Sequence, residues 1–161
     1  VTWVRTHAEE FGGDPEKVVI MGHSAGAAHV ATFLFDPDIR GETIVKGGLL
    51  SSGLYEVPKG TKAPNLLAYF GDDESTFERR SAINHVKESK VPVCLSVAEY
   101  DPPGLITPAF DIAKALVARS SLCPPIRCAE GHNHFSTVAS MGTSDNDFAQ
   151  YTIDFVHKCV G

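Results

Sequence analysis

The stretch Val18-Val19-Ile20-Met21-Gly22-His23-Ser24-Ala25-Gly26 is the part of the sequence from which the fold is predicted. Its first four residues are apolar and rich in β-branched side chains, which is typical of a strand buried on both faces of a parallel sheet. Its last five residues match G-x-S-x-G, a pattern that places a serine on a sharp turn between a strand and a helix. The alanine-rich residues 25–35 are predicted to form that helix, and Asp36-Pro37 is expected to end it.

The glycines of this nucleophile elbow have a predicted steric role. The serine must occupy a strained turn so that its hydroxyl clears the sheet, and bulk at Gly22 or Gly26 is expected to collide with the neighbouring strand or helix. Ser24 is therefore the candidate nucleophile, provided that a base takes its proton. The N–H of Ala25, at the start of the helix, is the candidate oxyanion donor. His23 is expected to pack beneath the elbow. A glycine-flanked serine in an ordinary turn is the alternative interpretation.

Length and composition indicate one globular domain, residues 1–161. The chain has 43% hydrophobic residues and a formal net charge of −6. This acidic balance argues against a nucleic-acid or anionic-membrane partner, since both require a basic surface. No apolar run approaches the ~18 residues that suggest a membrane span. The four cysteines include no C-x-x-C pair, so we expect no structural zinc site or disulfide scaffold, and a cytoplasmic location is favoured. A Cys123–Cys128 disulfide is left open.

Strand-like runs alternate with helix-like runs along the chain, which predicts a parallel sheet flanked by helices. After the strand at 18–21, further strands are expected at 44–50, 91–97 and 125–129. Helices are expected at 3–11, 25–35, 64–70, 75–87 and 107–119, with Thr107-Pro108 opening the last of these, and from Ser144 or Asp145 to 159.

The partners of a nucleophilic serine are expected to follow it in the order acid, then histidine. Asp101 comes just after the third predicted strand, at the edge of the sheet where ligand-facing groups collect. His132 and His134 follow the fourth predicted strand, and one of them is the candidate general base. An ordinary turn aspartate and structural histidines are the alternatives. The rival acids are Glu99, Asp72 and Asp73.

Several motifs together resemble the carboxylesterase and arylformamidase-like branch of the α/β-hydrolase superfamily. They are residues 11–15 with 18–27, the run Tyr69-Phe70-Gly71-Asp72, residues 97–103, and Gly131-His132-Asn133-His134-Phe135-Ser136. In that family the catalytic histidine directly precedes a large apolar residue, so the resemblance favours His134 over His132. It implies a three-layer α/β/α fold and a serine hydrolase that cleaves a small carboxylic ester through an acyl-enzyme, with the triad Ser24, Asp101 and His134 and without a cofactor or metal.

One family feature does not appear in this sequence. Members carry an H-G-G loop that supplies the other half of the oxyanion hole, and no His-Gly-Gly occurs here. The residues before Ser24 are fewer than the ~30 that a βαβ unit needs, so we expect the loop and the early strands to lie outside this sequence. Gly47-Gly48 is a poor substitute. The strand at 18–21 would then be an unpaired edge, which predicts self-association or completion by a missing amino-terminal segment.

Two further alternatives concern the reaction itself. An arylformamidase-type amide hydrolase would use the same triad with a different pocket, and a truncated, non-catalytic α/β-hydrolase fragment would use none of it. The irregular residues 54–90 are expected to line the substrate pocket. Tyr55, Phe70 and Phe77 are candidate contacts there, or else core aromatic residues.

Overall fold

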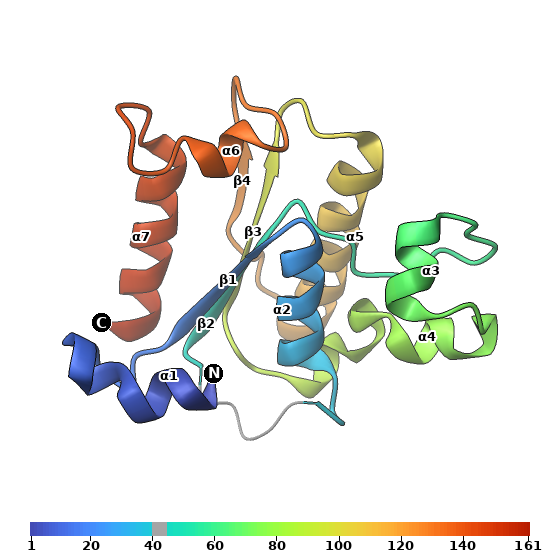
Figure 1. Cartoon of the computed structure of the whole chain (residues 1–161), viewed down its shortest axis with the longest axis horizontal. Helices are drawn as coiled ribbons and strands as arrows, with labels where there is room; N and C mark the ends of the chain where they lie inside the picture. The colour runs from blue at the N-terminus through green and yellow to red at the C-terminus, as the bar shows by residue number, and fades with distance from the viewer. Residues whose placement is uncertain (40–44) are drawn as a thin grey trace.

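The computed structural model describes residues 1–39 and 45–161, and its centre is a parallel sheet. Within these residues the strands are β1 (Val19–His23), β2 (Gly47–Ser51), β3 (Val93–Ala98) and β4 (Ile126–Ala129), arranged in the order β1-β2-β3-β4. Every neighbouring pair is parallel, with Val19 opposite Gly47, Gly48 opposite Val93, and Leu95 opposite Ile126. The carboxyl ends of all the strands therefore meet at one edge of the sheet, the upper edge in Figure 1.

Helices cover both faces of this sheet (Figure 1). The α-helices are α1 (Thr2–His7), α2 (Ala25–Phe35), α3 (Pro64–Phe70), α4 (Phe77–Arg80), α5 (Pro103–Ser120), α6 (Ser136–Ala139) and α7 (Asp147–Val160). The short 3-10 helices are η1 (Ala8–Phe11), η2 (Glu74–Thr76) and η3 (Ala82–Glu88).

The alternation of side chains along the strands explains the layers. Leu50 and Leu95 point into the core under α2 and α5, where they pack with Leu34 and Ile112. Leu49, the next residue in β2, points to the opposite face and packs with Cys94, Phe148 and Phe155 beneath α7. The predicted arrangement of a parallel sheet between two layers of helices is confirmed.

Two predicted helical segments differ from the structure. The helix expected at 107–119 begins at Pro103, and Pro108 lies inside it. Pro103 occupies the first helical position, where a missing N–H costs nothing. The predicted start at Pro108 is therefore wrong, because Pro103 is the proline that opens the helix. Residues 75–87 form separate short pieces, η2, α4 and η3, rather than one helix.

Smaller differences occur at the ends of elements. β1 ends at His23 instead of Met21, because the strand continues in register with β2 to Ser51. The start of the strand predicted at 44–50 lies outside the described residues. The last helix begins at Asp147 after Asn146, not at the caps that we expected, and α6 in the loop before it was not predicted.

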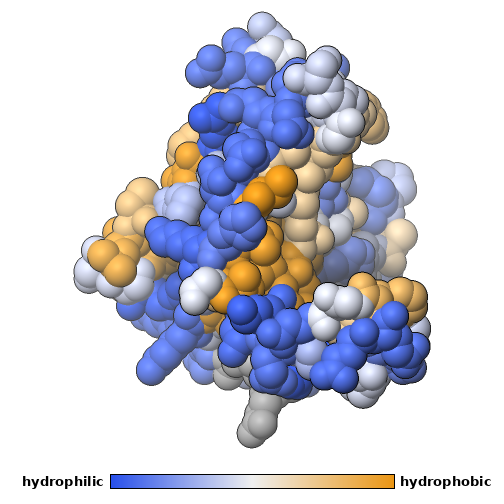
Figure 2. Space-filling view, turned by 90° about the vertical axis from the view of Figure 1, so that its left-hand side faces the viewer, coloured by the Kyte–Doolittle hydropathy of each residue, from blue (hydrophilic) through white to orange (hydrophobic). Residues whose placement is uncertain are grey.

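One edge of the sheet is formed by β1, which has β2 as its one hydrogen-bonded neighbour in the described part of the chain. The preceding α1 and η1 contribute no buried residue, and they leave Trp3 and Phe11 63% and 77% exposed. Figure 2, which views the side that carries α1 and α7, shows apolar surface in a central hollow between polar side chains. The prediction that the first strand is an edge strand is confirmed for these residues.

Two further expectations concern cysteines and membranes. Cys123 and Cys128 are both exposed free thiols in the structure, so they form no disulfide with each other there. Among the described residues, no helix combines the length and apolar character needed to span a bilayer.

Candidate active site

Ser24 occupies the sharp turn between β1 and α2 that the motif predicts. Its backbone has φ 57° and ψ −124°, a left-handed conformation that non-glycine residues seldom adopt and that costs energy. The turn is held because the N–H of Ser24 donates to the carbonyl of Ser51 at 2.9 Å, which continues the pairing of β1 with β2. The strained serine is therefore fixed at the carboxyl edge of the sheet.

The two glycines of the elbow turn out to be unequal. A Cβ atom at Gly22 would lie 2.1 Å from the carbonyl oxygen of Gly26, a backbone atom that cannot move aside independently of the helix. A Cβ atom at Gly26 would meet no atom within 4 Å outside its own helical turn. The steric role predicted for Gly22 is confirmed, whereas the one predicted for Gly26 is wrong, because position 26 faces open space.

Ala25 is the first residue of α2, so its N–H lies outside the helical hydrogen-bond ladder. The next N–H groups turn inward, since those of Ala27 and Ala28 both donate to the carbonyl of Ser24 at 3.0 and 3.4 Å. A free N–H directly after the serine is the kind of donor that an oxyanion requires.

Asp101 is the acid that the fold brings to this edge. Its side chain is fully buried at the end of β3, and both carboxylate oxygens have partners. Oδ2 accepts hydrogen bonds from the hydroxyl of Ser52 at 2.6 Å and from the N–H of Ala98 at 2.7 Å. Oδ1 lies 2.8 Å from Nδ1 of His134. A buried carboxylate with this many donors is held in one orientation.

The structure separates the two histidines of the loop after β4. His134 is the one that contacts Asp101, whereas Nε2 of His132 lies 3.2 Å from the carboxylate of Asp145. His132 also approaches the hydroxyl of Ser136 at 3.2 Å through Nδ1. His132 therefore ties the histidine loop to the loop before α7, and it is His134 that faces the buried acid.

Two of the three rival acids, Glu99 and Asp73, have other partners. Glu99 accepts a hydrogen bond from the N–H of Gly131 at 2.7 Å, which connects the loop after β3 to the histidine loop. Asp73 accepts hydrogen bonds from the N–H and the hydroxyl of Ser75 and so caps η2. Among the described residues, neither of these carboxylates contacts a loop histidine.

His23 lies beside the candidate base rather than beneath the elbow. Its ring centroid is 4.4 Å from that of His134, with 37° between the ring planes. Burial lowers the pKa of His23, and the neighbouring His134 lowers it further, because a second positive charge there would be repelled. His23 is thus held neutral next to His134.

Ser24, His134 and Asp101 gather at one edge of the sheet, but the contact between the first two is open. In the described part of the chain, no hydrogen bond joins the Ser24 hydroxyl to His134. Such bonds are often long or poorly aligned in the absence of substrate and tighten when substrate binds.

Ser52 is the residue that our sequence reasoning missed. It directly follows β2, has φ 49°, and is fully buried against Asp101. Its N–H donates to the carbonyl of Ser96 in β3 at 2.8 Å. The available signal was a small polar residue just past the carboxyl end of a buried strand, the same signal that identified Asp101.

The aromatic residues considered for the pocket are buried core residues, and of these Tyr55 also lines a cavity of about 460 Å³ beside the start of α5, and Phe77 a smaller one. Tyr55 is buried in the cluster beneath α2 and α5, and Phe70 and Phe77 are buried with Val57 in a smaller cluster beside α3 and α4. No cluster of histidine, cysteine and acidic side chains suitable for a metal ion occurs among the described residues.

Comparison with known proteins agrees with this geometry. Residues 1–70 match the family model "Carboxylesterase family". The apo form of Thermogutta terrifontis esterase 2 superposes on 97% of this chain and 59% of its own, with a TM-score of 0.68 and 24% sequence identity. The chain therefore shares the fold of this esterase over part of the esterase's length.

Curated relatives share short segments with this chain. Chlorogenic acid esterase of Aspergillus niger is 30% identical over 118 residues, which are 69% of this chain and 22% of that protein. Acetylcholinesterase of Gallus gallus is 42% identical over 59 residues, 37% of this chain and 7% of that protein. The matched segments are therefore a minor part of each relative's length.

Proposed function

We propose that this chain carries the triad of a serine hydrolase that cleaves carboxylic esters, with Ser24 as nucleophile, His134 as general base and Asp101 as the acid. The observation that supports this most strongly is the 2.8 Å contact between the buried Asp101 carboxylate and Nδ1 of His134, beside the strained serine. The esterase and cholinesterase relatives support ester substrates.

The proposed reaction proceeds through an acyl-enzyme. A hydrogen bond from Nδ1–H to Asp101 leaves Nε2 of His134 as an acceptor, so His134 takes the proton as the Ser24 hydroxyl oxygen attacks the carbonyl carbon. The Ala25 N–H stabilises the tetrahedral oxyanion. His134 then gives the proton to the leaving alcohol. In the second half of the reaction, His134 takes a proton from water as the water oxygen attacks the acyl carbon, and it returns the proton to the Ser24 oxygen as the acid leaves. Asp101 orients the imidazole and does not itself take the proton.

The rate of ester hydrolysis depends on a second hydrogen-bond donor in the oxyanion hole. The sequence contains no His-Gly-Gly, and removal of one donor typically lowers kcat by about 10²–10³. We therefore expect residues 1–161 alone to turn over esters slowly, while Ser24 keeps its reactivity towards acylating reagents.

Hydrolysis of p-nitrophenyl butyrate by matched variants tests the assignment. Ser24→Ala and His134→Ala should reduce the rate to the uncatalysed background, whereas His132→Ala should retain most of it, because His132 contacts Asp145 rather than Asp101. Unchanged activity in His134→Ala would overturn the proposal. Faster turnover of N-formylkynurenine than of the ester would replace the ester reaction with amide hydrolysis of the arylformamidase type.

We also propose that the edge formed by β1, with the exposed side chains of α1 and η1, associates with a further amino-terminal segment or with a second copy of the chain. The exposed Trp3 and Phe11 and the unpaired edge of β1 support this, since apolar edges tend to pair. Sedimentation equilibrium of residues 1–161 should show association that the double variant Trp3→Ser, Phe11→Ser weakens. A monodisperse monomer would contradict it.

The cytoplasmic location remains a prediction from cysteine usage. One relative, from Gibberella zeae, is named as a secreted triacylglycerol lipase.

A further inference from the structure

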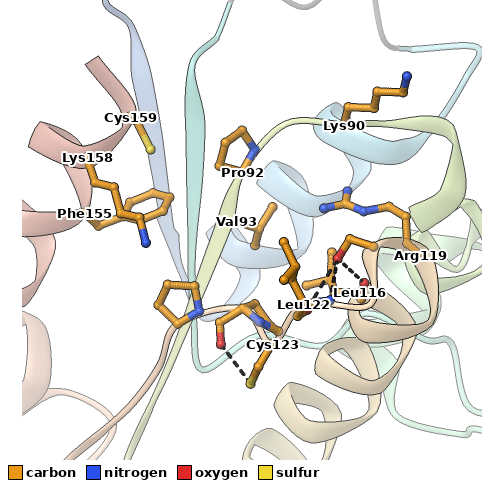
Figure 3. Close-up of a pocket in the computed structure, with 13 residues that line it drawn as sticks. Lys90, Pro92, Val93, Leu116, Arg119, Leu122, Cys123, Phe155, Lys158 and Cys159 are labelled. Atoms are coloured by element: carbon orange, nitrogen blue, oxygen red, sulfur yellow. Dashed lines mark hydrogen bonds between the residues drawn. The ribbon is translucent and has the colours of Figure 1, made fainter. Parts of the chain in front are cut away.

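A cavity lies at the amino ends of β3 and β4, at the edge of the sheet opposite Ser24. It occupies about 320 Å³ between α5, α7 and residues 121–125 (Figure 3). That volume falls at the lower end of the range for small-molecule sites, about 300–1,000 Å³. The cavity is separate from the candidate active site, because it is lined by the start of β3 and the carboxyl-terminal halves of α5 and α7.

The floor of this cavity is apolar. Val93 from β3, Leu116 from α5 and Phe155 from α7 line it and are otherwise buried in the core. Leu122 lies on the rim and is 72% exposed, so it adds apolar surface next to the buried floor. A hydrocarbon chain would cover this surface and remove it from water.

Three cations surround the same floor. Lys90, Arg119 and Lys158 line the cavity, and among residues 1–39 and 45–161 no acidic side chain does. Figure 3 shows Arg119 and Lys158 extending from α5 and α7 on opposite sides of the hollow, while Lys90 points away from them. In a chain with a formal net charge of −6, this local excess of positive charge runs against the overall balance.

These cations lack carboxylate partners in the described part of the chain. Arg119 donates to the carbonyl of Ser89 at 2.6 Å, a neutral acceptor. Burial lowers the pKa of Arg119, because the guanidinium gives up hydration without gaining a counter-charge. Asp154, one helical turn before Lys158, accepts a hydrogen bond from Gln150 at 2.7 Å. An anion at this site would therefore supply the missing partner for Arg119 and Lys158.

We propose that this cavity binds an aliphatic carboxylate, with its hydrocarbon chain against Leu122 and the apolar floor and its carboxylate against Arg119 or Lys158. A small inorganic anion would leave the apolar lining at Leu122 uncovered, and an uncharged lipid would leave the cations without a counter-charge among the described residues. An amphiphilic anion meets both requirements. This inference does not depend on the esterase assignment.

Isothermal titration of the purified protein with sodium decanoate tests the site. We expect saturable binding. The variant that carries both Arg119→Gln and Lys158→Gln should bind about tenfold or more weakly, since loss of hydrogen bonds to a charged group has effects of this size. Lys114→Gln, an exposed change on the same helix, should bind decanoate as the wild type does. Ser24→Ala should also bind normally, which separates this site from any binding of the acid at the nucleophile.

Two ligand controls separate the head from the tail. 1-Decanol should bind at least about tenfold more weakly than decanoate, and inorganic phosphate should not compete at equal concentration. Leu122→Ser, at an exposed rim position, should weaken decanoate binding while leaving the fold intact. If the change at Arg119 prevents folding, Lys158→Gln alone, at an exposed position, serves in its place.

Three results would overturn the proposal. They are the absence of saturable decanoate binding, equal affinity in the wild type and the cation variants, and binding of decanol or phosphate that matches decanoate.

Discussion

Two adjacent buried serines allow the contribution of Ser52 to be isolated. Ser51 and Ser52 are both 0% exposed, but the Ser52 hydroxyl donates to the buried Asp101 at 2.6 Å, whereas the Ser51 hydroxyl has no partner among the described residues. Ser52→Ala keeps the Cβ atom and hence the backbone strain at φ 49°, so the change removes one hydrogen bond to a charged group. Such a bond contributes about 1.5–3 kcal/mol.

The matched change at Ser51 should be nearly neutral, because it removes an unsatisfied hydroxyl rather than a bond. We therefore expect Ser52→Ala to be about 2 kcal/mol less stable than Ser51→Ala, a factor of about thirty in the folding equilibrium. With an m-value of about 2 kcal/mol/M, the urea midpoint of Ser52→Ala should lie about 1 M lower. Urea unfolding followed by circular dichroism at neutral pH measures both. Equal midpoints for the two variants would refute the role given to Ser52.

Three further predictions follow from the same edge of the sheet. Gly22→Ala should destabilise the protein by about 3 kcal/mol, because the added Cβ collides with the carbonyl of Gly26. Gly26→Ala should stabilise α2 by up to about 1 kcal/mol, because its Cβ meets no other atom. Thermal unfolding compares the two variants, and similar losses of stability would contradict this difference. The pKa of His23 is lowered in the folded state, so the unfolded chain binds more protons, and stability should fall as the pH drops below about 6.5. The fall should be less steep in His23→Gln. An equal change of the urea midpoint between pH 8 and pH 5 in both proteins would argue against this. Asp101→Asn should keep the fold, as seen by circular dichroism, and lower kcat by about 10³–10⁴, because an amide at this position favours the wrong tautomer of His134. A loss below tenfold would exclude the role given to Asp101.

Much of the site was predictable because it depends on chain order and strand ends. A parallel sheet collects the residues that follow its strands at one edge, so Ser24, Asp101 and the histidine loop could be placed together from the sequence. Ser52 follows the same rule, but serines are common and nothing local distinguishes it from Ser51. Its importance arises from a contact with Asp101, a residue far along the chain, which no local pattern encodes.

The errors have similar causes. Gly26 matches the motif as well as Gly22 does, and the direction of its missing side chain becomes visible only when the helix is packed on the strand. The start of α5 was placed at the wrong proline because both Pro103 and Pro108 carry the same local signal. The cavity at the opposite edge depends on cations from three segments that the sequence keeps apart, Lys90, Arg119 and Lys158.

Fluorophosphonate labelling followed by peptide mass spectrometry tests most directly whether this chain holds an activated serine. We predict one adduct, on the peptide that contains Ser24, formed by the native protein and abolished in His134→Ala and after unfolding in urea. Absence of an adduct at Ser24 in the folded protein, or equal labelling when His134 is replaced, would contradict the account.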